Sequence, residues 1–261
     1  MELGLKGRVA IVTGASKGMG FATARAFARE GARVLMISRT PETLSAAEQS
    51  IRKGGGEVMS LAGDVADPGL PARALAECVS KWGTVHALVN NAGGPPPGTL
   101  MEQDDAAWAA ALDRNLMATI RFTRAVIPAM TKQKWGRIVS ITSTIAKEPA
   151  PSMVLSATAR SGVAAFTKAI ASELAASNVT VNVVNPGSVL TDRSRELIGA
   201  RAKRENRNYD EVLAESQATT PAKRFATPEE IANVIVFLAS DAASYVNGVS
   251  LSVDGALTKG F

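Results

Sequence analysis

Short runs of β-branched and apolar residues alternate along this chain with longer stretches of helical periodicity. Such alternation is typical of repeated strand, helix, strand units, in which consecutive strands are parallel. Several runs are apolar almost throughout, as strands covered by helices on both faces should be. We predict strands at Val9–Thr13, Arg33–Ser38, Glu57–Ala62, Ala87–Asn90, Arg137–Thr142, Thr180–Val184 and Ser250–Val253. The expected fold class is α/β, with one doubly wound, parallel, seven-stranded sheet, helices on both of its faces and a ligand crevice at the carboxyl ends of its strands.

The helices between these strands are expected to begin near Met19, Pro41, Pro68, Ala106, Ser152 and Pro228. Asp67-Pro68 and Thr227-Pro228 each place an N-cap residue before a proline at the first helical position. The polar, charge-rich stretch over residues 191–218 is either a substrate lid or a solvated helix pair. At 261 residues, a single domain is the expected organisation.

Composition excludes several classes of partner. The net charge of +5 arises from basic residues interleaved with acidic ones, which argues against nucleic acid as a partner. The single cysteine, Cys78, lies in a helical pattern, so that a packed thiol in a reducing compartment is expected. Met1 leads almost directly into a strand, and apolar runs end well before the ~20 residues of a membrane span. We therefore expect a cytoplasmic protein with no membrane partner.

A glycine-rich loop, Thr13-Gly14-Ala15-Ser16-Lys17-Gly18-Met19-Gly20, joins the first strand to the first helix. Glycines at such a turn let the backbone approach a pyrophosphate, and the helix N-terminus presents free N–H groups and a positive dipole end. The order strand, loop, helix favours a dinucleotide site. The sequence therefore predicts one NAD(P)-binding domain of the Rossmann type over residues 1–261.

The end of the second strand distinguishes between the two nicotinamide dinucleotides. An acidic residue there would bond the adenine ribose hydroxyls of NAD, but this strand ends Ile37-Ser38-Arg39. Arg39, together with Lys17 inside the glycine loop, is suited to bind a 2′-phosphate. We therefore expect NADP(H) in preference to NAD(H), and we expect no metal.

Four further motifs follow the glycine loop. Asn90-Asn91-Ala92-Gly93 closes the fourth strand, and Asn185-Pro186-Gly187-Ser188-Val189-Leu190-Thr191 follows the sixth. Ser240-Asp241-Ala242-Ala243-Ser244-Tyr245 and Val253-Asp254-Gly255 come near the end of the chain. Together with the glycine loop, these motifs resemble the short-chain dehydrogenase/reductase family over essentially the whole chain.

The resemblance implies a role for each matched residue. Asn115 is similar to the family's asparagine that supports a proton-relay water, and Ser143 is similar to its catalytic serine. The implied cofactor-binding residues are Gly14, Ser16, Lys17, Gly18, Met19, Gly20, Ser38, Arg39, Asp64, Val65, Asn91, Ala92, Gly93, Arg160, Pro186, Gly187, Val189 and Thr191. The resemblance also implies a homo-oligomer, a tetramer or dimer, formed through helices at Trp108–Gln133 and Ser152–Ala176 and the last strand.

The pattern departs from the family where a Tyr-x-x-x-Lys pair is expected. Thirteen residues after Ser143 stands Ser156, and four residues further stands Arg160. The chain thus resembles a divergent branch of the 3-oxoacyl-carrier-protein reductases, with Ser-x-x-x-Arg at these positions. Serine is a far weaker acid than tyrosine, and arginine remains protonated, so that neither can relay a proton as the family pair does. We expect Asn115, Ser143, Ser156 and Arg160 to be the catalytic residues, with Arg160 stabilising a developing oxyanion.

Three functions remain open on this pattern. The first is an NADP(H)-dependent oxidoreductase that reduces a carbonyl, or oxidises an alcohol, of a small to medium organic substrate. The second is a non-redox lyase or dehalogenase-like enzyme, because halohydrin dehalogenases resemble this family and also carry arginine for the lysine. The third is a cofactor-binding protein without turnover. Other residues are poor substitutes for the missing acid, since Tyr245 suggests an interface, Tyr209 lies in the lid stretch and His86 lies at the start of the fourth strand, away from the crevice.

Overall fold

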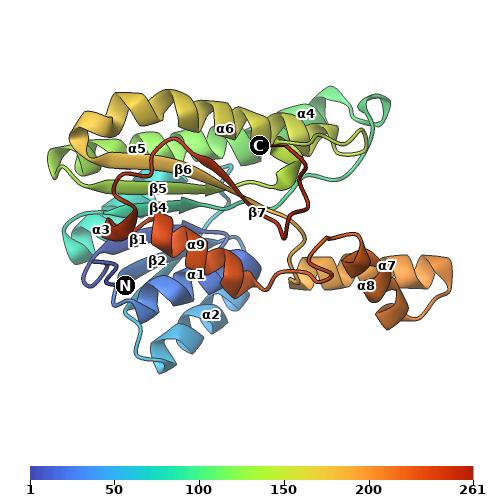
Figure 1. Ribbon diagram of the computed structural model, residues 1–261. Coiled ribbons are helices and arrows are strands. Elements are labelled where there is room, and N and C mark those ends of the chain that lie inside the picture. The colour runs from blue at the N-terminus through green and yellow to red at the C-terminus, as the bar shows by residue number, and fades with distance from the viewer. Residues whose placement is uncertain (261) are drawn as a thin grey trace.

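A parallel sheet of seven strands, in the order β3-β2-β1-β4-β5-β6-β7, organises the computed structural model, which describes residues 1–260 (Figure 1). The strands are β1 (Val9–Thr13), β2 (Arg33–Ser38), β3 (Val58–Ala62), β4 (Ala87–Asn90), β5 (Gly136–Ile141), β6 (Val179–Pro186) and β7 (Ser250–Val253). The direction of winding reverses between β1 and β4, which opens a crevice beyond the carboxyl ends of these strands. The predicted doubly wound α/β fold is therefore confirmed. Phe261, the last residue of the predicted domain, lies outside the described residues.

Helices cover both faces of this sheet. They are α1 (Gly18–Arg29), α2 (Pro41–Lys53), α3 (Leu70–Trp82), α4 (Asp105–Leu112), α5 (Ala118–Lys132), α6 (Val154–Leu174), α7 (Asp192–Glu205), α8 (Tyr209–Ala218) and α9 (Pro228–Leu238). Buried side chains of α1, α2 and α9 join one apolar core, and those of α3, α5 and α6 join a second core. The sheet lies between these two layers of helices, so that its strands are packed on both faces.

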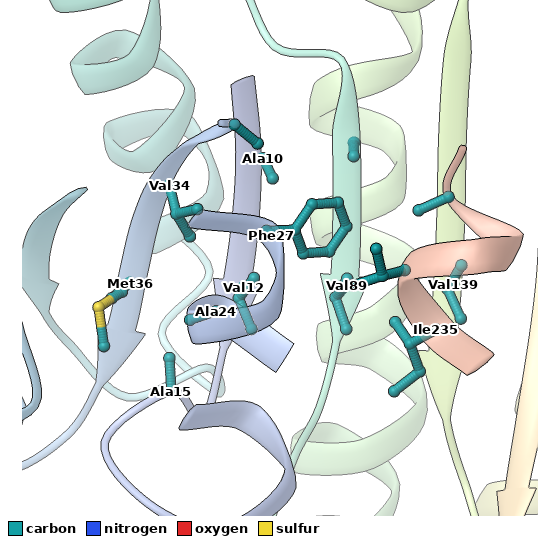
Figure 2. Close-up of a cluster of buried hydrophobic side chains, with 14 of the residues drawn as sticks. Ala10, Val12, Ala15, Ala24, Phe27, Val34, Met36, Val89, Val139 and Ile235 are labelled. Carbon is teal, nitrogen blue, oxygen red and sulfur yellow. The ribbon is translucent and has the colours of Figure 1, made fainter. Parts of the chain in front are cut away.

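The two cores follow from the alternation of side chains along each strand. Ala10 and Val12 of β1 belong to the first core, whereas Val9 and Ile11 belong to the second. Figure 2 shows Phe27 of α1 pointing toward the sheet among side chains of the first core. Because both faces of β1 are buried, the glycine loop that follows it starts from a fixed position.

Two helix starts test the predicted caps. Thr227 caps α9 as predicted, because its hydroxyl accepts from the N–H of Glu230 (3.3 Å). The predicted start at Pro68 is wrong, since α3 begins at Leu70. Asp67 Oδ1 accepts instead from the N–H of Gly69 (2.8 Å), which forms a local turn before the helix.

The helix predicted over Trp108–Gln133 is interrupted. Helices α4 and α5 are separated by a π-helical turn over Asp113–Met117, which carries Asn115. Periodicity cannot distinguish such a turn from a continuous helix, because one extra residue barely changes the apolar stripe. The Ser152–Ala176 helix is observed as α6.

Helices α7 and α8 form a pair that projects beyond the sheet (Figure 1). Ile198, Ala202 and Val212 make a small apolar cluster of their own, against which Tyr209 packs. Arg201 and Arg207 both pair with Glu215, which ties the two helices together on their exposed side. Residues 191–218 thus form a helix pair with an independent core.

Cys78 is buried in α3, as the sequence predicts. Burial, and secondarily the charge of Glu77, raise the pKa of its thiol to about 12. The thiol is therefore a packing group and is not a nucleophile at neutral pH. Among the helices within residues 1–260, none has the length and apolar character that crossing a membrane requires.

His86 lies just before β4, at the end of the sheet opposite the crevice. Its Nδ1 accepts from the N–H of Val9 (3.0 Å), and its ring packs edge-on against Trp135. Burial, and then the charge of Arg8, lower the pKa of His86 to about 4. It is therefore a packed, neutral histidine at pH 7.

We expect His86 to make the protein less stable in acid. The pKa of His86 is about 4 in the folded state and about 6.5 when unfolded, so that below pH 6.5 the unfolded chain binds more protons. The free energy of unfolding should therefore fall between pH 6.5 and 4, by about 2 kcal/mol for this half-buried ring. Urea unfolding at several pH values should show this slope, and His86→Gln, which retains an acceptor, should reduce it. An unchanged slope would assign the acid sensitivity to other groups.

Candidate active site

A cavity of about 330 Å³ occupies the crevice at the carboxyl ends of β1, β2 and β4. It is lined by most of the predicted cofactor-binding residues, namely Gly14, Ser16, Lys17, Gly18, Met19, Ser38, Arg39, Asp64, Val65, Asn91, Ala92, Gly93, Arg160 and Thr191. These residues come from segments far apart in the chain, and the winding of the sheet brings them together. The candidate cofactor site and Arg160 therefore share one cavity.

The glycines of the loop are required by its geometry. Gly14 and Gly18 have φ angles of +59° and +57°, a region in which a side chain is strained. A Cβ at Gly20 would lie 2.2 Å from the carbonyl oxygen of Gly14, so that only glycine fits beneath the turn. The loop therefore keeps its backbone close to the start of α1, whose first N–H groups have no partner within a regular helix.

Asn91 fastens this loop to β4. Thr13 Oγ1 accepts from the N–H of Asn91 (2.8 Å) and donates to the carbonyl of Asn91 (2.9 Å). The side-chain amide of Asn91 donates to the carbonyl of Gly14 (3.2 Å). These bonds fix the loop without using the N–H groups at the start of α1.

The predicted phosphate-selecting residues lie together at one rim of the cavity. Ser38 and Ser16 share a hydrogen bond between their hydroxyls (2.9 Å), which joins the end of β2 to the glycine loop. Arg39 and Lys17 line the same cavity and are exposed, so that their charges can reach a ligand. A hydroxyl pair flanked by two cations matches the donors that a 2′-phosphate needs.

The segment after β6 contributes only one of its predicted residues to the lining of the cavity. Thr191 lines the cavity and caps α7 by accepting from the N–H of Ser194 (3.2 Å). Pro186 ends β6 and Gly187 follows it, where a Cβ on Gly187 would lie 2.8 Å from that of Asp254. Val189 is buried and bridges to Ala226. In the part of the chain that the structure describes, these last three predicted residues support the cavity wall without lining it.

Arg160 is anchored against the end of β5. Its Nη1 donates to the carbonyl of Thr142, the residue before Ser143, and one residue further Ser161 Oγ donates to the carbonyl of Ala146 (2.9 Å). These two bonds fix α6 against the turn that begins at Ser143. Arg160 Nε is buried and has no hydrogen-bond partner within residues 1–260. Burial lowers the pKa of Arg160 to about 10, which leaves the guanidinium charged at pH 7.

The other three predicted catalytic residues are Ser143, Ser156 and Asn115. Ser143 caps a short helical turn, and Ser156 is buried on α6 one turn before Arg160. Asn115 is buried, and its amide donates to the carbonyl of Ala111 (3.1 Å). None of these three residues is among the described residues that line the cavity.

Sequence reasoning missed five residues of the cavity. Gly63, Gly94, Arg114, Asp192 and Arg193 line it as well. Gly63, Gly94, Asp192 and Arg193 each lie within two positions of a predicted cofactor-binding residue, so that extending those motifs would have found them. Arg114 lies next to Asn115, which was predicted for a different role. Its Nη2 lies 3.2 Å from Asp64 Oδ2 and forms an ion pair with that carboxylate.

The donor set fits a dinucleotide. The glycine cradle and the start of α1 suit a pyrophosphate, and the Ser38, Arg39 and Lys17 rim suits an added phosphate. Within residues 1–260 no cluster of His, Cys, Asp or Glu is suited to hold a metal ion.

Comparisons with known proteins agree with this geometry. A family model described as enoyl-(acyl carrier protein) reductase matches residues 14–258. A putative ketoacyl reductase of the monensin polyketide synthase from Streptomyces virginiae is 35% identical, over 96% of this chain and 97% of its own length. The 3-oxoacyl-[acyl-carrier-protein] reductase FabG of Escherichia coli is 34% identical, over 98% of this chain and 99% of its own.

A solved structure extends the likeness to the whole fold. The L-sorbose reductase of Gluconobacter frateurii, complexed with NADPH and L-sorbose, superposes with a TM-score of 0.97, at 33% identity, over 100% of both chains. Family match, relatives and fold agree over nearly the full length. The chain therefore belongs to the short-chain dehydrogenase/reductase family and is an NAD(P)-dependent oxidoreductase.

Proposed function

We propose that this protein reduces a carbonyl group of a small to medium organic substrate with NADPH, or oxidises the corresponding alcohol with NADP⁺. The observation that carries the proposal is that one cavity is lined by the glycine loop, by the Arg39 and Lys17 rim and by Arg160. The similar L-sorbose reductase is described with NADPH and a keto sugar, which supports both the cofactor and the substrate class. When bound, NADPH supplies the hydride.

The residues of this chain would hold the cofactor in three places. The glycine loop and the start of α1 bind the pyrophosphate, and Arg39 with Lys17 binds the 2′-phosphate. Asp64, Val65 and the Asn91–Gly93 segment border the adenosine half. The segment from Pro186 to Thr191 borders the nicotinamide half.

Arg160 would stabilise the negative charge that develops on the carbonyl oxygen. It is charged at neutral pH, anchored through Thr142 and partly desolvated, which strengthens its interaction with an oxyanion. It does not give up a proton in this range. The proton would come from solvent, relayed through water held near Ser143, Ser156 and Asn115, whose hydroxyl and amide groups can orient it. In this branch, Ser156 and Arg160 thus stand for the tyrosine and lysine of the family.

The non-redox alternative is not favoured. The relatives are named as reductases, and the glycine loop of this chain retains the geometry of a dinucleotide site. A cofactor-binding protein without turnover would bind NADPH equally well, and only transfer of the hydride separates it from an enzyme.

The substrate would enter beside α7 and α8. We place a lid at residues 191–218, because this pair has its own small core and begins at Thr191, which lines the cavity. The prolines over residues 95–97 and the apolar residues over 149–155 would form the walls of the substrate space.

Cofactor preference tests the proposal directly. NADPH should bind at least about tenfold more tightly than NADH, because Arg39 and Lys17 add charge-assisted bonds to the 2′-phosphate. Titration of the intrinsic or nicotinamide fluorescence would give both dissociation constants. Equal affinities would contradict the NADP(H) assignment.

We also propose a homo-oligomer. Leu251 of the edge strand β7 is 40% exposed and Met117 before α5 is 38% exposed, so that apolar surface is available on elements that family members use. Tyr245, which precedes β7, is fully exposed as well. Light scattering should therefore give the mass of a dimer or tetramer. A monomer across the micromolar range would contradict this expectation.

A further inference from the structure

Asp64 places a negative charge beside the rim that is proposed to select NADPH. It follows β3 and lines the same cavity as Arg39 and Lys17. Its Oδ1 accepts from the N–H of Ala66 (3.1 Å), which fixes the orientation of the carboxylate. Its Oδ2 faces two guanidinium groups, Arg114 Nη2 at 3.2 Å and Arg39 Nη1 at 4.0 Å.

The two arginines differ in how firmly they are held. Arg39 has a side chain that is 64% exposed, and its contact with Asp64 is at the limit of an ion pair. Arg114 makes the shorter contact, its side chain is 41% exposed, and its Nε is buried with no hydrogen-bond partner among residues 1–260. A buried donor without a partner has a free-energy cost, which the bond to Asp64 offsets.

Charge balance gives Arg114 a function in this arrangement. With Arg114 present, the side chains of Asp64, Arg39 and Arg114 carry a net charge of +1. Arg114 then balances the charge of Asp64, so that Arg39 is not needed for this. Without Arg114, Asp64 would attract Arg39, the net charge would be zero, and the carboxylate would repel an incoming phosphate. Arg114 therefore keeps Arg39 available.

From this network we infer that Arg114 is a positioning residue that sets the preference for NADPH over NADH by pairing with Asp64. The inference rests on the proposed NADP(H)-dependent function and adds a residue from the π-helical turn before α5 to its cofactor selection. Arg114 acts through Asp64 and Arg39, so that its effect depends on the carboxylate.

The chain offers a matched control in Arg121. This arginine of α5 reaches the same loop, where Nη1 donates to the carbonyl of Ala66 (3.3 Å), and Nη2 pairs with Asp113 at 2.7 Å. It supports the loop that carries Asp64 without contacting that carboxylate. Arg121→Met therefore reports the effect of weakening the loop alone.

The experiment measures the dissociation constants of NADPH and NADH for five proteins: the unaltered chain, Arg114→Met, Asp64→Asn, the double variant and Arg121→Met. Arg114→Met should weaken NADPH binding about tenfold and NADH binding less than about twofold. The double variant should return to within about threefold of the unaltered preference, because the carboxylate is gone. Arg121→Met should leave the ratio of the two constants unchanged.

The outcomes separate this inference from the proposed function. If the unaltered protein binds NADPH and NADH equally, the NADP(H) assignment itself fails. If it prefers NADPH but Arg114→Met keeps that preference, or weakens both cofactors equally without rescue by Asp64→Asn, then Arg114 has only a structural role. Loss of the preference in Arg114→Met with recovery in the double variant is the result that we expect.

Discussion

Replacement of Arg160 by alanine is expected to lower kcat for reduction by NADPH by about 10²–10³-fold, the effect of removing one oxyanion donor from a preorganised site. Arg160 is the cation of α6 that faces the cofactor cavity, and it is anchored to the carbonyl of Thr142. The variant would therefore lose both the charge and part of the support for Ser143. The decrease should appear in steady-state oxidation of NADPH with a carbonyl compound that the unaltered chain reduces.

The control for this variant is Arg124→Ala, which removes an exposed arginine from α5. Its kcat and its affinity for NADPH should match those of the unaltered chain. In Arg160→Ala, NADPH affinity should fall by no more than about tenfold, because most of the cofactor contacts lie elsewhere. A kcat that survives Arg160→Ala would remove Arg160 from the proposed chemistry.

Substitution of Gly20 by valine should weaken NADPH binding at least about 100-fold, because the glycine loop can no longer lie close to the start of α1. A Cβ at this position would lie 2.2 Å from the carbonyl oxygen of Gly14 and 2.7 Å from the amide nitrogen of Asn91. Both neighbours belong to the hydrogen bonds that fix the loop, so that neither can yield without opening it. Calorimetric titration with NADPH would measure the loss.

Gly199→Ala in α7 is the matched control, since no heavy atom lies within 4 Å of a Cβ placed there. This variant should bind NADPH normally and should unfold at the same or a slightly higher temperature. If Gly20→Val bound NADPH as tightly as the unaltered chain, the loop would not be the pyrophosphate site.

Much of this fold could be predicted because each strand is bounded by clear local signals. β1, β2, β4 and β7 have the predicted bounds, since each is a short segment bounded by turn residues. The errors come from local hydrogen bonds, such as the turn at Asp67 that delays α3, and from the π-helical turn at Asp113–Met117. Neither changes the apolar periodicity on which the prediction depends.

The candidate site was predicted where its residues belong to contiguous motifs. The glycine loop, Arg39, Asp64 and the Asn91–Gly93 segment all meet at one cavity. The pairing of Arg114 could not be assigned from the sequence, because its partner Asp64 lies 50 residues away and only the packing of the π-helical turn against the end of β3 brings them together. Tyr209 illustrates the opposite case, since it lies in the predicted lid but packs on the core of α7 and α8.

We propose that this chain transfers hydride with Ser156 and Arg160 at the positions where the family resemblance leads us to expect a tyrosine and a lysine. The most direct test uses NADPH carrying deuterium at the transferred position, offered with a panel of ketones, β-ketoacyl thioesters, enones and imines, with the products read by mass. We expect deuterium in at least one carbonyl-derived product and its loss with Arg160→Ala. Absence of transfer across the panel, in samples where NADPH is shown to bind tightly, would contradict the claim and would favour a protein that binds the cofactor without turnover.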